Sequence, residues 1–261
     1  MHTSAIEEAF GMLDRGFLAS VARRGPSPVF ASVSGAHLYG FASRDSDVDL
    51  RGAFVRPVSE VLGMFPKDET LTVVDTTVVD LDWVAHDVRK FCRLMTGHNG
   101  YVLEQLYSPL VVVETEALRE LRELGRGCVT RPTVRHYLGF AHGRRKRLAE
   151  PDATVKHLLY AYRVYLSGIH LMRTGEIEAH LGTLNDAYRR PEIDDLVVRK
   201  REGAEKMKLH PGELERHSSL LDALERELDE AHARSHLPDE PTTVRELDAF
   251  VVRLRLAGEC P

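Results

Sequence analysis

The sequence predicts an α/β (α+β) fold, with a mixed-sheet domain followed by an all-helical domain. In the first half, helical patterns alternate with short runs of β-branched and other apolar residues that are typical of strands. Beyond residue 132 only helical patterns remain. Gly125, Gly127 and Pro132 cluster between the two halves and predict a connection there. We therefore expect one domain over residues 1–128 and a helical domain over residues 129–261.

Apolar spacing defines the elements of the first half. Helical spacing predicts a helix over 6–24, which Gly25 and Pro26 end. Expected strands cover 29–33, 47–55 and 71–84, and the last is long and rich in β-branched residues. A helical turn is expected at 37–41, a loop at 43–46, a connector or short helix at 57–62, helices at 86–94, 101–106 and 117–124, and a short apolar run at 110–113. In the second half, helices are expected at 133–148, 154–174, 176–189, 192–208, 213–235 and 243–256.

The composition is that of an ordinary globular protein. The 261 residues are 43% hydrophobic and 29% charged, and no apolar run approaches the length of a membrane span. The first residues include acids and lack a signal-peptide core, so we expect a cytoplasmic protein without a membrane partner. The net charge of −5 argues against an extensive basic surface. Segment 126–147 nevertheless carries seven Lys or Arg and no acid, and is either a phosphate-binding patch or a solvated helix face.

The segment from Ser32 to Gly52 carries the strongest chemical signal. Asp47 and Asp49 are two residues apart on an expected strand, so their side chains share one face. Adjacent carboxylates repel each other unless a cation lies between them, and Mg²⁺ prefers carboxylate and phosphate oxygens. A turn of small residues at Ser34 and Gly35 lets backbone N–H groups approach a phosphate. Together these features indicate phosphoryl or nucleotidyl transfer.

This segment resembles the DNA polymerase beta nucleotidyltransferase superfamily, and within it the RNA-repair-associated predicted nucleotidyltransferase branch. Members of the branch read approximately G-S-x-x-Y-G-x-x-x-x-x-S-D-x-D-x-R-G. The residues in step with that pattern are Gly35, Tyr39, Gly40, Ser46, Asp47, Asp49, Arg51 and Gly52. Ala36 stands where the pattern has serine, and a serine instead precedes the glycine, at Ser34. The phosphate-binding hydroxyl is therefore either supplied by Ser34 or missing, and Ser34, Gly35 and Ser46 are the expected nucleotide-binding residues of this segment.

The resemblance also implies the rest of the site. A third metal-binding carboxylate is expected at Asp82, a few residues before the family's His-Asp-Val-x-Lys-Phe helix, and Asp80 is its competitor. Asp47, Asp49 and Asp82 would then be both catalytic residues and ligands of Mg²⁺ or Mn²⁺. Lys156 and Arg163 match a Lys-His-x-x-x-x-x-Arg pattern of the family and, seven residues apart, share a helix face on which they would hold the nucleotide's phosphates.

For several side chains around the acids, a structural role is the alternative to a contact with substrate. An ion pair of Arg51 with one of the acids is favoured over a phosphate contact, and Glu104 is expected to brace the site through Arg51 or Lys90. For Lys156 and Arg163, an ordinary position on the surface of an amphipathic helix is the alternative.

Three functions remain open from the sequence. The first is a Mg²⁺-dependent nucleotidyltransferase that moves the nucleoside monophosphate of ATP or another NTP to a hydroxyl, for which the resemblance implies an RNA end in RNA repair, and releases pyrophosphate. The second keeps this chemistry with a small molecule or a protein side chain as acceptor. The third is a catalytically silent module that binds a nucleotide or a partner, which Ala36 would favour. The sequence specifies neither base preference nor oligomeric state.

Overall fold

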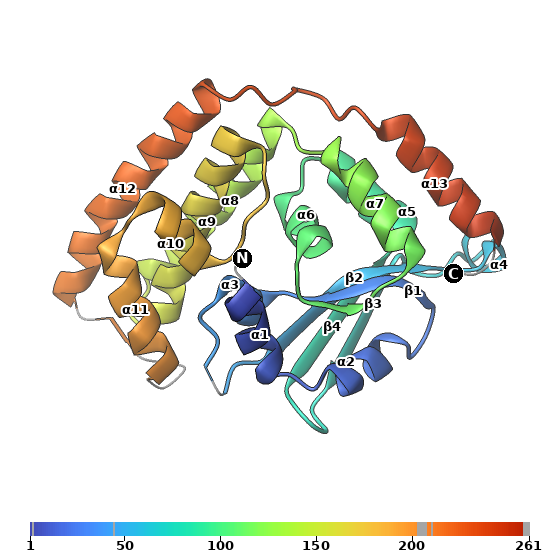
Figure 1. Ribbon diagram of the computed structural model, residues 1–261, viewed down its shortest axis with the longest axis horizontal. Helices are drawn as coiled ribbons and strands as arrows, with labels where there is room; N and C mark the ends of the chain where they lie inside the picture. Colours follow the sequence, from blue (N-terminus) through green and yellow to red (C-terminus); the bar gives the residue numbers. More distant parts are fainter. Residues whose placement is uncertain (2, 44, 203–207, 210, 258–261) are drawn as a thin grey trace.

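The computed structural model describes all residues except 2, 44, 203–207, 210 and 258–261, and its described part holds one mixed sheet. The strands are β1 (Ser27–Val33), β2 (Val48–Val55), β3 (Thr70–Asp75), β4 (Leu81–Asp87) and β5 (Val111–Val113), in the order β3-β4-β2-β1-β5 (Figure 1). β2 and β4 run parallel, whereas the other neighbouring strands are antiparallel. The expected mixed-sheet α+β fold is therefore confirmed.

Helices cover both faces of the sheet. The helices of the first half are α1 (Thr3–Gly11), α2 (Arg15–Ala22), α3 (Gly35–Tyr39), α4 (Val58–Val61), α5 (Val88–Thr96), α6 (Gly100–Tyr107) and α7 (Glu116–Arg126). In Figure 1, α5, α6 and α7 lie on one side of the sheet, and α1 and α2 lie on the other. The Ser32 hydroxyl of β1 donates to the Gln105 carbonyl of α6 (2.8 Å), and the Phe30 and Phe91 rings of β1 and α5 pack edge to face.

A helical layer follows, with α9 at its centre. After a short 3-10 helix, Arg131–Thr133, the chain forms α8 (Val134–Leu148), α9 (Val155–Thr174), α10 (Leu181–Tyr188), α11 (Pro191–Glu202), α12 (Pro211–Ala233) and α13 (Val244–Ala257). α9 contacts α8, α10, α11 and α12, and most of its side chains are buried. Within the described ranges, no helix has the length and apolar character needed to cross a membrane.

Two elements that were expected to be continuous are each divided into two in the structure. The helix expected over 6–24 is interrupted, because Asp14 accepts a hydrogen bond from Phe17 N (2.9 Å) and starts α2 as a separate helix. The strand expected over 71–84 is an antiparallel hairpin. Asp75 accepts hydrogen bonds from the backbone N–H (3.0 Å) and hydroxyl (2.6 Å) of Thr77, which turns the chain between β3 and β4.

Several element boundaries also differ from those expected. The helix expected from 86 begins two residues later because His86 and Asp87 complete β4, and that expected from 176 begins at Leu181, where His180 provides the N-cap. The C-terminal part of the helix expected over 192–208 includes residues 203–207, which lie outside the described residues.

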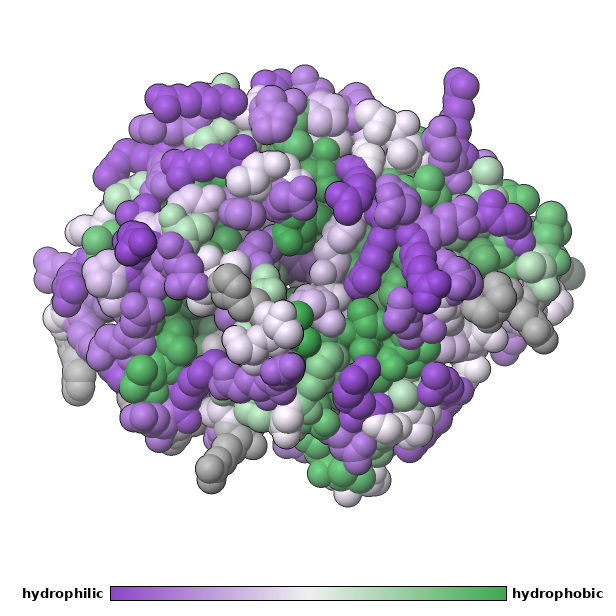
Figure 2. Space-filling view, viewed as in Figure 1, coloured by the Kyte–Doolittle hydropathy of each residue, from purple (hydrophilic) through white to green (hydrophobic). Residues whose placement is uncertain are grey.

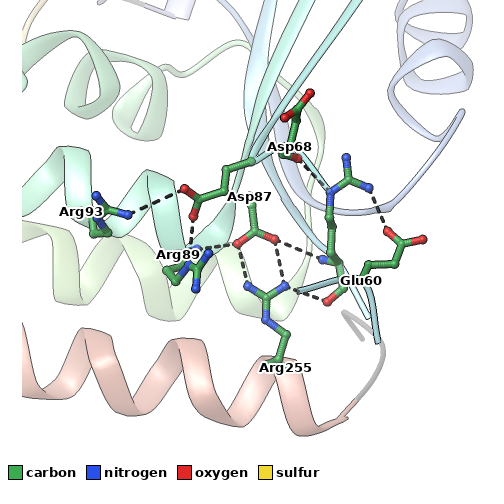
Figure 3. Close-up of polar contacts among 8 residues, drawn as sticks. Glu60, Asp68, Asp87, Arg89, Arg93 and Arg255 are labelled. Atoms are coloured by element: carbon green, nitrogen blue, oxygen red, sulfur yellow. Dashed lines mark hydrogen bonds and ion pairs between the residues drawn. The ribbon is translucent and has the colours of Figure 1, made fainter. Parts of the chain in front are cut away.

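The last helix returns to the first half of the chain. α13 packs against α5 and α7, and in Figure 1 it lies beyond them, far from α12. Figure 3 shows Arg255 of α13 facing Asp87, which accepts from both guanidinium nitrogens (2.6 and 2.9 Å) and also caps α5 through Arg89 N (3.0 Å). Asp87 is 1% exposed, and Arg255 is the cation that pairs with its carboxylate. The proposed division at residue 128 stays a prediction, and α13 makes its contacts across it.

We predict that Arg255→Ala lowers the free energy of unfolding by about 3–5 kcal/mol, because it leaves the Asp87 carboxylate buried without its cation. Arg253→Ala on the same helix is the matched control. Its ion pair with Glu120 is about half exposed on both sides, so its loss should cost under about 1 kcal/mol. Urea titrations of both variants measure the difference, and equal losses would contradict the assigned role of Arg255.

Candidate active site

Adjacent parallel strands bring the expected acids together. In the pairing of β2 with β4, Asp49 lies directly opposite Asp82, and Asp47 comes one residue before β2 begins. Partners in a ladder project to the same face of the sheet, and alternate residues along a strand share that face. The carboxylates of Asp49 and Asp82 are therefore side by side at the beginning of both strands.

Arg51 lies between these two carboxylates. Its Nη2 donates to Asp49 Oδ1 (2.5 Å) and to Asp82 Oδ2 (2.9 Å), and its Nη1 donates to the carbonyls of Leu50 (2.7 Å) and Asp82 (2.6 Å). Nε donates to the Tyr101 hydroxyl (3.1 Å), so the guanidinium is held on every side. The expected pairing of Arg51 with the acids is confirmed, and Arg51 holds two of them.

The small-residue turn packs directly onto Asp49. Ser34 N donates to the Asp49 carbonyl (2.8 Å), which ties the turn to β2. Gly35 has φ +61°, and a Cβ atom placed there would lie 2.0 Å from Asp49 Oδ2. Only glycine suits both the backbone conformation and the contact, because any other residue would displace the carboxylate. Gly35 therefore leaves room for the Asp49 side chain.

Burial and charge act in opposite directions on Asp49. Burial raises the pKa of its carboxyl group, Arg51 and Lys156 lower it, and the neighbouring Asp47 and Asp82 raise it. Lys156 is on the first turn of α9, so its effect on the pKa of Asp49 indicates that this helix begins near the acids. Tyr160, one turn further along, has its pKa raised by burial and by the negative charge of Asp49. The expected placement of Lys156 near the site is thus consistent with its effect on Asp49.

Arg163 is buried at the contact between α9 and α6. It is 4% exposed, and its Nη1 donates to both carboxylate oxygens of Glu104 (2.7 Å each). Its guanidinium also lies over the Tyr39 ring, 4.1 Å from the centroid. Glu104 therefore braces the site through Arg163, whereas bracing through Arg51 or Lys90 was expected. A phosphate contact by Arg163 stays a prediction, and this geometry favours a structural role.

The serines of the motif are buried. Ser34 is fully buried, and its hydroxyl has no hydrogen-bond partner in the described part of the chain. Ser46 Oγ accepts from Ser43 N (3.0 Å) and contacts Ser43 Oγ (3.1 Å), to which the buried Lys200 of α11 donates (2.6 Å). Ser46 thus closes the loop that precedes Asp47, and α11 fixes that loop from the helical layer.

The third carboxylate is better placed at Asp82 than at Asp80. Asp82 pairs with Asp49 across the strands and shares Arg51 with it, whereas Asp80 is exposed and precedes β4. The strand register and the shared arginine therefore favour Asp82 as the third carboxylate.

Hard oxygen donors at the acids fit a divalent cation. As the described side chains stand, no three His, Cys, Asp or Glu residues form a ready metal cluster. Within the same residues, however, Asp49 Oδ2, Asp82 Oδ1 and the exposed Asp47 carboxylate make no hydrogen bond to the protein. These oxygens are the type of ligand that Mg²⁺ takes.

Three residues near the acids were not predicted from the sequence as part of the site. Tyr101 lies in a segment that the resemblance covers, yet only the structure shows its hydroxyl on Arg51. Tyr160 and Lys200 lie on amphipathic helices, where periodicity does not distinguish a site residue from a core residue.

The basic segment 126–147 is partly neutralised in the structure. Four of its seven cations have acidic partners, namely Arg126 with Glu123, Arg131 with Asp239, Arg145 with Asp222 and Glu225, and Arg147 with Asp152.

Comparisons with known proteins agree with this geometry. Residues 14–253 match the family described as RlaP, the RNA repair pathway DNA polymerase beta family. A Bacillus subtilis (strain 168) protein described as "Uncharacterized protein YcgL" is 31% identical over 189 residues, which cover 68% of this chain and 71% of that protein. Because the match to the family spans most of the chain, from α2 to α13, and includes all three acids, the chain belongs to the RNA repair pathway DNA polymerase beta family.

Proposed function

We propose that the protein is a Mg²⁺-dependent nucleotidyltransferase that transfers the nucleoside monophosphate of an NTP to a hydroxyl acceptor and releases pyrophosphate. The observation that carries the proposal is the pairing of Asp49 with Asp82 on parallel strands, with Arg51 between them and Gly35 packed against Asp49. Membership in a polymerase beta-like family supports the same reaction class.

The three carboxylates have separate tasks in this proposal. Asp47, Asp49 and Asp82 would hold the divalent cations, which supply charge stabilisation to the attacking and leaving oxygens. Asp82 is also the base that takes the proton of the attacking hydroxyl, because it is more exposed than Asp49 and lies at the open side of the pair. Arg51 fixes the orientation of Asp49 and Asp82, and its positive charge opposes the rise that burial causes in the pKa of Asp49.

The nucleotide would lie on the side of Asp49 that faces α3 and α9. The turn at Ser34 and Gly35 is close to Asp49 there, and Lys156 provides a positive charge for the phosphates. Donation by the unpartnered Ser34 hydroxyl to a phosphate oxygen would compensate for Ala36, and because this hydroxyl is fully buried the contact requires the turn to move when the nucleotide binds. On this side, Ser46 stabilises the loop before Asp47. Arg163 stabilises the contact between α6 and α9.

We propose an RNA end as the acceptor, since the family is described as an RNA repair family. A small molecule or a protein side chain would require the same acids. The alternative of a silent binding module has one observation in its favour, the alanine at position 36. Retention of all three acids argues against it, because a module without catalysis has no need for an assembled carboxylate pair.

Asp47→Asn and Asp49→Asn should each lower turnover by roughly a hundredfold or more, because each removes a charge that holds the cation. The measurement is Mg²⁺-dependent release of pyrophosphate from each of the four NTPs, in the presence of a pool of RNA ends. Isothermal calorimetry of the same variants with NTP, with Mg²⁺ or with EDTA, reports binding separately.

Asp80→Asn is the matched control for these two variants. It removes the same charge two residues from Asp82 at an exposed position, so activity should stay within about twofold of the wild type. Full activity in both Asp47→Asn and Asp49→Asn would contradict the mechanism. Absence of NTP binding by the wild-type protein would favour the silent module.

Lys156→Ala should weaken NTP binding by about tenfold, because one charged contact to phosphate is lost, and should weaken acceptor binding much less. Lys67→Ala is the control, since Lys67 is exposed and pairs with Glu60 of α4. Helix α4 follows the end of β2, whereas Asp49 lies at the beginning of that strand. Calorimetric titration with NTP and Mg²⁺ compares the two. Unchanged affinity in Lys156→Ala would assign Lys156 to the helix surface.

A further inference from the structure

A hollow of about 490 Å³ lies between the edge of the sheet and α5. The lining of the hollow includes Thr70 and Thr72 of β3 and Lys90 and Arg93 of α5. We call this hollow the β3–β4 groove, because β3 lines it and β4 is the next strand of the sheet. None of the residues assigned above to nucleotide binding lines it.

The strand register connects this groove to Asp82. Asp82 pairs with Val74, Val84 with Thr72, and His86 with Thr70, so these three pairs follow one another on the face of the sheet that carries the acids. This face is open, because Val74 is 70% exposed and Thr72 is also exposed. Figure 2 shows apolar surface at the lower edge of the view, where Figure 1 draws the tip of the β3–β4 hairpin. An open path thus runs from Asp82 past Val74 and Thr72 to Thr70.

Lys90 supplies a cation at the far end of this path. Its ammonium donates to Thr70 Oγ1 (2.5 Å) and helps lower the pKa of His86, after the larger effect of burial, to about 4. Among the described residues, no carboxylate lies within ion-pair distance of Lys90. A half-buried ammonium whose protein partner is a neutral hydroxyl suits an anionic ligand. Glu69, at the same end, is already shared by Arg89 and Arg93.

Resting on the proposed function, we propose that the β3–β4 groove binds the 3′ end of a single-stranded RNA acceptor, with a backbone phosphate on Lys90 and the terminal hydroxyl at Asp82. In-line displacement requires the attacking hydroxyl to approach opposite the leaving pyrophosphate. With the nucleotide on the α3 and α9 side of Asp49, the acceptor comes from the side of Asp82, from which the exposed strand face leads to the groove.

The length of the path favours a polynucleotide over a small molecule as the acceptor. Asp82 and His86 are four positions apart along β4, which is about 13 Å at about 3.3 Å per residue. A ligand that reaches both Asp82 and the ammonium beside Thr70 is therefore extended, with an uncharged part over Val74 and Val84 and an anion beyond them. The sugars and phosphates of a polynucleotide have this alternation.

Binding of a 5′-fluorescein-labelled single-stranded RNA 12-mer to the full-length protein, followed by anisotropy, tests the groove. Lys90→Met should weaken RNA binding roughly tenfold, because one phosphate contact is lost, and should lower the slope of log K against log salt by about 0.7. Lys90→Arg should restore both quantities. Thr72→Glu changes an exposed position, so it should not prevent folding. It should also weaken binding, because it places a negative charge on the path of the RNA phosphates.

Lys146→Met is the matched control, because it removes the same charge from the exposed surface of the basic segment 126–147. RNA affinity should be unchanged in it, and NTP binding measured by calorimetry should be unchanged in Lys90→Met. A larger loss in Lys146→Met than in Lys90→Met would overturn the groove in favour of α8. Wild-type protein that binds NTP but not RNA would overturn it while leaving nucleotidyl transfer intact, whereas failure to bind either ligand would contradict the proposed function as well.

Discussion

The ion pair of Arg51 with Asp49 and Asp82 is the interaction on which the site depends. Parallel pairing of β2 with β4 places the two carboxylates at the spacing of neighbouring strands, about 4.8 Å, where they repel by roughly 3 kcal/mol at an effective dielectric constant of 20. Arg51 offsets this repulsion from within the same sheet, and Tyr101 fixes the guanidinium from α6. The arrangement therefore requires neither a bound ion nor a nucleotide to remain assembled.

Buried charges also determine how the helical layer meets the sheet. Arg163 of α9 reaches Glu104 of α6, and Lys200 of α11 reaches the Ser43 hydroxyl in the loop before the acids. Such contacts contribute little net stability, because desolvation cancels much of the attraction, but any other packing would leave a buried charge unpaired. They therefore specify one orientation of α9 and α11. The loop that carries Asp47 takes its position from both halves of the chain.

The sequence predicted which acids lie together better than it predicted the residues that support them. The period of a strand was sufficient to place Asp47 and Asp49 on one face, and resemblance added Asp82, which the register puts opposite Asp49. The hairpin within 71–84 was missed, since its turn depends on the Asp75 side chain and has neither glycine nor proline. Lys200 could not be predicted either, because a lysine near the end of a charged helix is usually exposed, and only the tertiary fold shows that it is buried.

Charge balance suggests how ligands assemble at this site. Three carboxylates, Asp47, Asp49 and Asp82, face the two cations of Arg51 and Lys156, so one negative charge is left over before any ligand binds. A divalent cation alone would therefore be attracted by only one excess negative charge. A triphosphate brings about four negative charges, which two divalent cations cancel, so nucleotide and metal together leave this balance unchanged. In the proposed nucleotidyltransferase, this balance would favour the metal–nucleotide complex over either component, and Arg51 would contribute to that preference.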